Sequence, residues 1–226
     1  MAPAGESLTS GRVAAWCSDG YVVVPGVVSV DACAALLERL VGHGERWMAG
    51  TPAGEWADRG DDLDLDAVPG PGRPAHEDRV LAEVGALLGV HARVVGRRMV
   101  LQQPGDDGEH WHQDAAPLPR APAHHQVGVE LALTEATLAT GCTWVVPGSH
   151  REPVHEHRPD PRPGRQGAVE LAAPDPERRV PVPLVPGDLL VVDSHLTHRS
   201  TDNHSTDVRV GLVWHCGPSP AAAGGT

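Results

Sequence analysis

The 226-residue chain contains no lysine, no phenylalanine and a single tyrosine, so every basic side chain other than histidine is an arginine. Acidic residues outnumber the arginines, and the formal net charge is −12. Proteins that bind nucleic acids present clustered basic side chains that neutralise phosphates. The charge balance therefore argues against a nucleic-acid partner and favours a small-molecule substrate.

Long apolar runs are also missing. No stretch of 18 apolar residues occurs, and residues 1–20 lack the continuous apolar segment of a secretory signal. The four cysteines, Cys17, Cys33, Cys142 and Cys216, are scattered without a C-x-x-C pair, which fits neither a disulfide framework nor a zinc cluster. We expect a cytoplasmic protein with free thiols and no membrane partner, and nothing in the sequence indicates its oligomeric state.

The N-terminal part of the chain has the pattern of a strand followed by a helix. Residues 20–25 form a β-branched run between a glycine and a proline, which predicts a strand. The apolar spacing that follows predicts a helix capped by Ser29 or Asp31 and ended by Gly42 or Gly44.

A second helix is expected at about 75–88, where valines and leucines recur at helical spacing. The segment 49–75 before it is rich in Gly, Pro and Asp without any period, and it fits a mobile loop over a site as well as a plain surface loop. The insert at 150–176 carries six prolines. It should lie outside the core, where it could act as a lid.

After Gly89, short β-type runs separated by turns continue to the end of the chain, and such a pattern predicts a sandwich or barrel. We expect one domain over residues 1–226, mainly β with flanking helices. Its parts are an N-terminal strand and helices at about 12–95, a β core at about 96–217 and a frayed tail at 218–226. The predicted strands lie at about 92–103, 126–134, 142–146, 179–185, 188–194 and 207–215.

The first chemical signal is the segment His112-Gln113-Asp114. Side chains two residues apart on extended backbone point the same way, so His112 and Asp114 can bind one metal ion together. With a distant second histidine they would form the 2-His-1-carboxylate triad of non-haem Fe(II) oxygenases. Alone, His-x-Asp is weak evidence, because a chain with 14 histidines produces it readily by chance.

Further motifs occur in a fixed order after this segment. They are a Gly-x-x-x-x-x-Pro-Gly-Ser-His run at 141–150, a Gly-Asp turn at 187–188, and His198 followed eleven residues later by Arg209. Together with His-x-Asp they resemble the phytanoyl-CoA dioxygenase family of Fe(II)- and 2-oxoglutarate-dependent oxygenases. The resemblance covers about residues 97–215, and more loosely 20–44.

The resemblance implies a double-stranded β-helix, that is, a cupin-like jelly roll, with Fe(II) held by His112, Asp114 and His198. It also implies that Arg209 binds the distal carboxylate of 2-oxoglutarate. The residues support this role, since an arginine on an apolar strand is costly unless an anion pairs with it. From the residues alone, Arg209 could instead pair with an acidic residue at a strand end.

Two polar residues stand where the family carries groups that bind the cosubstrate. Gln102 corresponds to an amide, although a polar strand residue could equally face solvent. Ser200 corresponds to a hydroxyl, although it could instead bond its own turn. Spacing to Arg209 selects His198 as the second histidine ligand over His195, which we expect at the rim of the site.

Three residues are candidates for contacting substrate. Glu130 departs from the family pattern; turned inward it could recognise a cationic or hydroxylated substrate, and turned outward it would meet solvent. His215 shares the side of Arg209 by alternation, and it either approaches the cavity or is a core histidine. His195 completes the set.

The resemblance implies an enzyme that consumes dioxygen, converts 2-oxoglutarate to succinate and CO2, and hydroxylates an unactivated C–H bond of a small molecule. Desaturation, epimerisation and cyclisation also occur in the family. Halogenating relatives lack the carboxylate ligand, so Asp114 predicts no halogenation. The composition is typical of GC-rich bacterial coding, where tailoring of a specialised metabolite is a reasonable role.

Two alternatives belong to other classes. A non-oxidative cupin-like isomerase or metal-dependent binder would keep the fold and the metal but would not need a buried arginine at position 209. A non-catalytic interaction module would need neither the three ligands nor the arginine, and all four residues are present.

Overall fold

The computed structural model describes residues 10–48, 75–116, 126–162 and 169–219. The loop expected at 49–75 lies outside these ranges except for its last residue, and so do residues 163–168 of the insert. Most of the expected tail lies outside them as well, although its first residue, Pro218, ends a strand. None of the described helices is long and apolar enough to cross a membrane.

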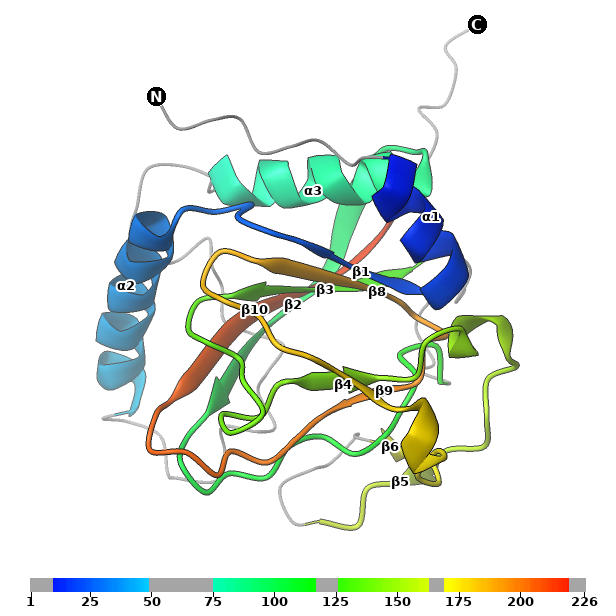
Figure 1. Cartoon of the computed structure of the whole chain (residues 1–226). Helices are drawn as coiled ribbons and strands as arrows, with labels where there is room; N and C mark the ends of the chain where they lie inside the picture. Colours follow the sequence, from blue (N-terminus) through cyan, green and yellow to red (C-terminus); the bar gives the residue numbers. More distant parts are fainter. Residues whose placement is uncertain (1–9, 49–74, 117–125, 163–168, 220–226) are drawn as a thin grey trace, which may run out of the picture.

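Two antiparallel sheets form the body of the protein. The strands of the larger sheet are β1 (Tyr21–Val24), β2 (Ala92–Gln102), β3 (Val127–Ala132), β8 (Leu189–Asp193) and β10 (Arg209–Pro218). The strands of the smaller sheet are β4 (Thr143–Val145), β7 (Val180–Val182) and β9 (His198–Ser200). Their spatial orders are β1-β8-β3-β10-β2 and β7-β4-β9, and the two sheets lie one above the other in Figure 1. This is the predicted jelly roll.

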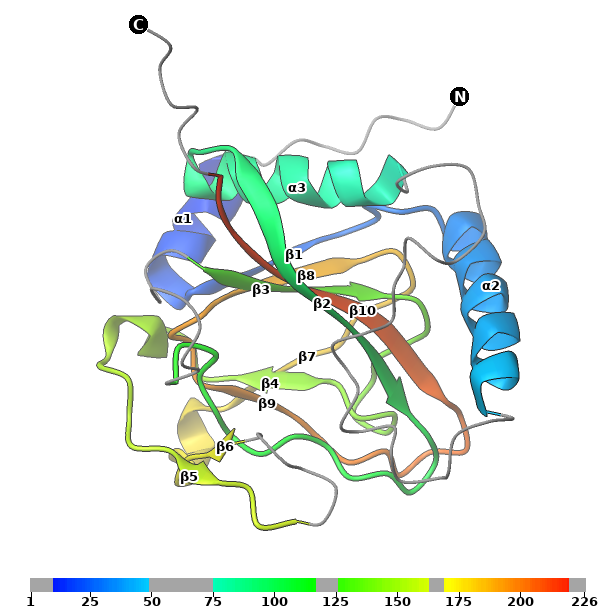
Figure 2. The same ribbon diagram turned by 180° about the vertical axis from the view of Figure 1, so that it is seen from behind.

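Helices cover the larger sheet. They are α1 (Ser10–Asp19), α2 (Val30–Met48) and α3 (Ala75–Leu88), and Figure 2 shows α3 lying across one end of the molecule with α1 and α2 on opposite sides. The insert forms a separate two-stranded sheet of β5 (Arg158–Pro159) and β6 (Val169–Glu170) beside the smaller sheet. Short 3-10 turns occur at Ser149–Arg151 and Pro176–Arg178.

Alternation along the central strands separates an apolar face from the site. On β10, Leu212 and Trp214 point toward the helices and join the core that contains Val80 and Val84 of α3. Residues one position along point inward, between the sheets. Arg209 and His215 therefore share the inner face, as the sequence predicted.

The second half of the core lies between the sheets. It joins Leu190 and Val192 of the larger sheet to Val145 and Val182 of the smaller one. Burial of these side chains holds the two sheets together at one end of the barrel.

Two details differ from the sequence prediction. The first predicted helix does not end at Gly42 or Gly44, because α2 continues through both to Met48. Glycine ends a helix only where the chain takes a left-handed turn, and here it merely lowers helix propensity. Helix α1 had not been predicted, because its apolar residues form a single run at 13–17 that is too short to distinguish a helix from a strand.

Candidate metal centre

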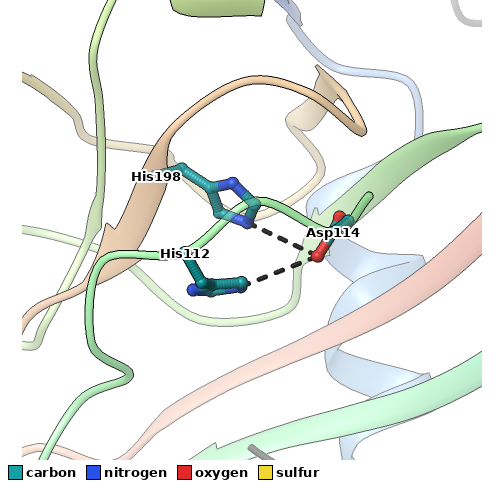
Figure 3. Close-up of side chains that lie close together, drawn as sticks. All are labelled: His112, Asp114 and His198. Carbon is teal, nitrogen blue, oxygen red and sulfur yellow. Dashed lines mark ion pairs between the residues drawn. The ribbon is translucent and has the colours of Figure 1, made fainter. Parts of the chain in front are cut away.

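Three side chains from two distant segments meet at the mouth of the barrel. His112 Nε2 lies 3.6 Å from Asp114 Oδ1, and His198 Nε2 lies 3.9 Å from the same oxygen. Figure 3 shows both imidazoles aimed at this oxygen. The ligand atoms of the three residues all lie within 4.8 Å of one another, so the predicted set His112, Asp114 and His198 is brought together.

The backbone fixes the two histidine segments against each other. His112 N–H donates to the carbonyl of His198 at 2.9 Å, and His198 N–H donates to the carbonyl of His112 at 3.0 Å. The two rings lie 4.3 Å apart between centroids. Backbone pairing of this kind holds the ligands in place independently of any bound ion.

Each histidine presents the same ring nitrogen to Asp114. His112 Nδ1 donates to the carbonyl of His110 at 2.8 Å, and His198 Nδ1 donates to the carbonyl of Leu196 at 2.9 Å. A carbonyl only accepts, so Nδ1 carries the proton and Nε2 offers its lone pair. Such support of the far nitrogen is usual for metal-binding histidines.

Electrostatics favour an ionised carboxylate. Burial raises the pKa of Asp114, but the charge of His198 and interactions with His112 and His215 outweigh it and hold that pKa well below its usual range. Burial lowers the pKa of His112, but Asp114 and Glu109 bring it above the ordinary value. The pKa of His198 is lowered by burial and by the charge of His112.

A glycine makes room for the carboxylate. A Cβ atom at Gly128 of β3 would lie 2.9 Å from Asp114 Oδ2. On the neighbouring strand, His215 Nε2 approaches the same oxygen at 3.6 Å. His215 is partly exposed and faces the site, so the alternative of a core histidine is wrong.

Gln113, between the two ligands, is 1% exposed, and the sequence did not single it out. Its Nε2 donates to the carbonyl of His195 at 2.7 Å, and its Oε1 accepts from His155 N–H at 2.8 Å. Its backbone N–H donates to His157 Nε2 at 3.0 Å. The insert thus clamps the ligand segment, a function that its loop-like sequence did not indicate.

A second group of possible ligands lies beside the insert. His110 Nε2 is 3.3 Å from Glu170 and 3.8 Å from Asp160. Arg162, however, binds both oxygens of Asp160 and, mainly through these hydrogen bonds, lowers the pKa of Asp160 to about 2. Because Arg162 occupies the oxygens of Asp160, this group is a poor metal site. Its hydrogen bonds instead hold the insert in place.

The imidazole of His195 is not part of the converging group, although the His195 carbonyl accepts a hydrogen bond from Gln113. Its Nδ1 lies 3.5 Å from Asp193 Oδ1. It lines a pocket of about 390 Å³ together with Trp16, Leu87 and Leu88, on the helix side of the larger sheet. This pocket contains none of the three ligands, and we place the reaction centre at the ligands because the converging polar groups lie there.

Arg209 is 2% exposed and lies deeper in the barrel. Its Nη1 donates to the carbonyl of Gly141 at 2.6 Å and to Gln102 Oε1 at 3.2 Å, and its Nη2 donates to Glu130. Its Nε is buried with no hydrogen-bond partner among the described residues. An unsatisfied N–H on a buried cation suits an incoming carboxylate.

Gln102 faces inward and not solvent. It is 5% exposed, and its Nε2 donates to the carbonyls of Thr201 at 2.7 Å and Asp106 at 3.4 Å. Because both amide hydrogens are used and the oxygen accepts from Arg209, the amide orients the guanidinium in this arrangement. Gly141 allows the close approach, since its φ is +97° and a Cβ there would lie 2.6 Å from Gln102 Oε1.

Ser200 joins the metal segment to the smaller sheet. Its Oγ accepts a hydrogen bond from Glu109 N–H at 2.8 Å, and its strand partner is Thr143. The alternative that it bonds its own turn is therefore wrong. Within the described part of the chain no residue accepts a hydrogen bond from this hydroxyl, so it can donate to a ligand.

Glu130 is buried and turned inward. It pairs with Arg209 and accepts a hydrogen bond from Thr143 Oγ1 at 3.1 Å. The alternative that it faces solvent is wrong. Arg209 does pair with an acidic residue, but this partner lies inside the barrel and not at a strand end.

Comparisons with known proteins agree with the fold and the ligand pattern. The family model described as phytanoyl-CoA dioxygenase (PhyH) matches residues 16–211. The mouse phytanoyl-CoA dioxygenase domain-containing protein 1 is 32% identical over 146 residues, which is 62% of this chain and 50% of that protein. The rice phytanoyl-CoA dioxygenase 1 is 33% identical over 54% of this chain and 43% of its own length. The chain spans about half the length of the curated relatives it matches.

Solved structures show the same fold. EvdO2 from Micromonospora carbonacea var. aurantiaca, crystallised with 2-oxoglutarate, is 22% identical over 98% of this chain and 96% of its own, with a TM-score of 0.76. The epimerase SnoN in complex with Fe3+, alpha ketoglutarate and nogalamycin RO is 21% identical over 92% of this chain and 82% of its own, with a TM-score of 0.65.

Proposed function

Since the chain belongs to the phytanoyl-CoA dioxygenase family, we propose that it is an Fe(II)- and 2-oxoglutarate-dependent dioxygenase that hydroxylates an unactivated C–H bond of a small molecule. One observation carries the proposal. Two imidazoles and a carboxylate converge at the barrel mouth, and on the inner face of the same barrel lies an arginine whose Nε has no hydrogen-bond partner among the described residues. A non-oxidative isomerase or binder does not require that arginine.

The residues present fit the metal and the cosubstrate. Two neutral Nε2 atoms and one carboxylate are the donor set that non-haem Fe(II) prefers. The guanidinium of Arg209 offers fixed, permanently charged donors to a carboxylate. When bound, iron and 2-oxoglutarate supply the oxidation: dioxygen is reduced, the cosubstrate is decarboxylated to succinate and CO2, and one oxygen atom enters the substrate.

The protein itself positions the metal ligands and the cosubstrate, and it excludes water from part of the site. The carbonyls of His110 and Leu196 hold the two imidazoles, and the insert holds Gln113 between the ligands. Arg209 orients the cosubstrate by its distal end. The apolar side chains packed between the two sheets keep bulk water from one side of the site.

The relatives support a small-molecule substrate but differ in reaction. SnoN is named as an epimerase and SnoK as a carbocyclase, both from nogalamycin biosynthesis. We infer a comparable role in tailoring a specialised metabolite, with hydroxylation as the outcome. Because Asp114 is present, no halogenated product is expected in the presence of chloride or bromide.

The test is oxygen-dependent turnover of 2-oxoglutarate with candidate metabolites, followed by mass spectrometry. The proposal expects succinate release together with a product heavier by one oxygen atom. Succinate with an isomeric product would replace hydroxylation by epimerisation. Isomerisation without oxygen and without succinate would overturn the oxygenase and favour the non-oxidative enzyme.

A further inference from the structure

Glu130 is the one carboxylate that touches Arg209 among the described residues. It lies on β3, and Thr143 on the opposite sheet binds its second oxygen. Both Glu130 and Arg209 are buried. The pair is therefore a desolvated ion pair with its own hydrogen-bond support, the kind in which removing one partner is costly.

The donors of Arg209 are already largely used. A guanidinium has five N–H groups. Two of them serve Gln102 and Gly141, and a third serves Glu130, which leaves Nε–H and the second hydrogen of Nη2. A carboxylate arriving there meets a cation whose charge is already neutralised.

Glu130 also lies along the path between the metal ligands and Arg209. Gly128, two residues earlier on the same face of β3, is the glycine that Asp114 packs against. Glu130 Oε1 in turn lies over β10, where a Cβ at Gly211 would be 3.1 Å away. Residues two apart on a strand are separated by roughly 7 Å. On the inner face of β3, Glu130 therefore lies between the strand position next to Asp114 and the guanidinium of Arg209.

We propose that Glu130 is a tethered competitor for the distal carboxylate of the cosubstrate: it occupies Arg209 in the cosubstrate-free protein, and 2-oxoglutarate binds by displacing it. The inference rests on the proposed function, which assigns Arg209 to the cosubstrate. Binding then exchanges one ion pair for another, so Arg209 contributes less to affinity than an unoccupied arginine would. Glu130 thereby sets a high requirement for 2-oxoglutarate.

The test compares two 2-oxo acids on the manganese-loaded protein, which binds them without turnover. 2-Oxovalerate has the same keto-acid end as 2-oxoglutarate but no distal carboxylate. Calorimetric titration of Glu130→Gln is expected to show about tenfold or tighter binding of 2-oxoglutarate than the wild type, because the amide keeps the shape but not the charge. Binding of 2-oxovalerate should stay unchanged.

Thr143→Val is the matched control. It removes the hydroxyl that donates to Glu130 but leaves the carboxylate in place. Because only the hydrogen-bond support of Glu130 is lost, we expect much less tightening of 2-oxoglutarate than in Glu130→Gln. Tightening equal to that of Glu130→Gln would show that loss of charge is not the cause and would overturn the proposal.

The remaining outcomes separate this inference from the proposed function. If the wild type binds 2-oxoglutarate but Glu130→Gln binds it equally or more weakly, Glu130 is not a competitor. The same follows if Glu130→Gln tightens both acids alike. If the wild type binds no 2-oxoglutarate at all, the proposed function fails as well.

A crystal structure of the wild type with 2-oxoglutarate decides the matter if Glu130→Gln does not fold. Glu130 beyond hydrogen-bonding distance of Arg209 Nη2, with the cosubstrate in its place, supports the proposal. An intact Glu130–Arg209 pair beside bound 2-oxoglutarate overturns it.

Discussion

At the scale of single residues, the choice between His198 and His195 as the second histidine ligand shows what motif spacing can predict. Both occur in one short segment, and only the distance to Arg209 separated them at the level of sequence. The structure brings His198 to Asp114 and turns His195 toward Asp193. Motif register therefore selected the histidine that lies beside Asp114, which composition alone could not have done.

His198→Ala is expected to weaken Fe(II) binding by more than about 100-fold, since even outer partners of metal ligands change affinity about 10- to 100-fold. His195→Ala serves as the control and should bind Fe(II) as the wild type does. Anaerobic equilibrium dialysis measures both. Retention of iron by His198→Ala with its loss in His195→Ala would make the ligand assignment wrong.

A test of Arg209 must avoid leaving the buried carboxylate of Glu130 without a partner. In a Glu130→Gln background, Arg209→Ala is expected to raise the KM for 2-oxoglutarate by about 30-fold or more while Fe(II) affinity is kept, because only the distal contact is lost. Arg93→Ala, at an exposed position on β2, is the control. An unchanged KM would contradict the assignment of Arg209.

Residue roles beyond the motif could not be read from sequence. Glu130 and Gln102 both allowed an inward and an outward orientation, because alternation fixes which residues share a face but not which face is inside. Gln113 gave no signal at all. Its importance comes from contacts with the insert and with His195, which are distant in sequence.

At the scale of elements, the turns and the insert hold the strands and the ligand segments in position. The turn at Gly187 precedes β8, with φ +95° and with the carbonyl oxygen of Val28 only 2.0 Å from where a Cβ would be. The Gly-Asp turn expected from sequence is thus required both by conformation and by space.

Gly187→Ala should therefore destabilise more than Gly105→Ala. Gly105 also has a positive φ, of +88°, but nothing lies within 4 Å of its Cβ position. A left-handed alanine costs about 1–2 kcal/mol. Overpacking against Val28 should add a further ~1–3 kcal/mol at Gly187 alone. Urea unfolding measures both, and equal losses would contradict the close contact.

The insert depends on the Asp160–Arg162 pair. The folded pKa of Asp160 is about 2, below its ordinary value of 3.8. The group therefore stabilises the fold above pH 4, and this contribution is lost as the pH falls toward 2. Asp160→Asn should lower Tm at neutral pH, with a difference from wild type that shrinks over this range.

Glu156→Gln, an exposed carboxylate in the same insert, is the control and should leave Tm unchanged throughout. A difference between wild type and Asp160→Asn that stays constant down to pH 2 would mean that the ionised Asp160 does not hold the insert.

At the scale of the whole molecule, strand periodicity predicted the core well. The six predicted runs correspond to β2, β3, β4, β7, β8 and β10. β9 was not predicted, because three residues are too short for a periodic signal and its pairing with β4 is set by tertiary contacts. The five-and-three division of strands between the two sheets likewise depends on pairings that no local pattern encodes.

The central claim is that distant segments of this barrel assemble one iron and 2-oxoglutarate centre. Anaerobic addition of Fe(II) and then 2-oxoglutarate to the wild-type protein, followed by visible absorption, tests it most directly. We predict a weak charge-transfer band that requires both additions and is absent from His198→Ala. Binding of both without the band, or a band that persists in His198→Ala, would contradict the claim.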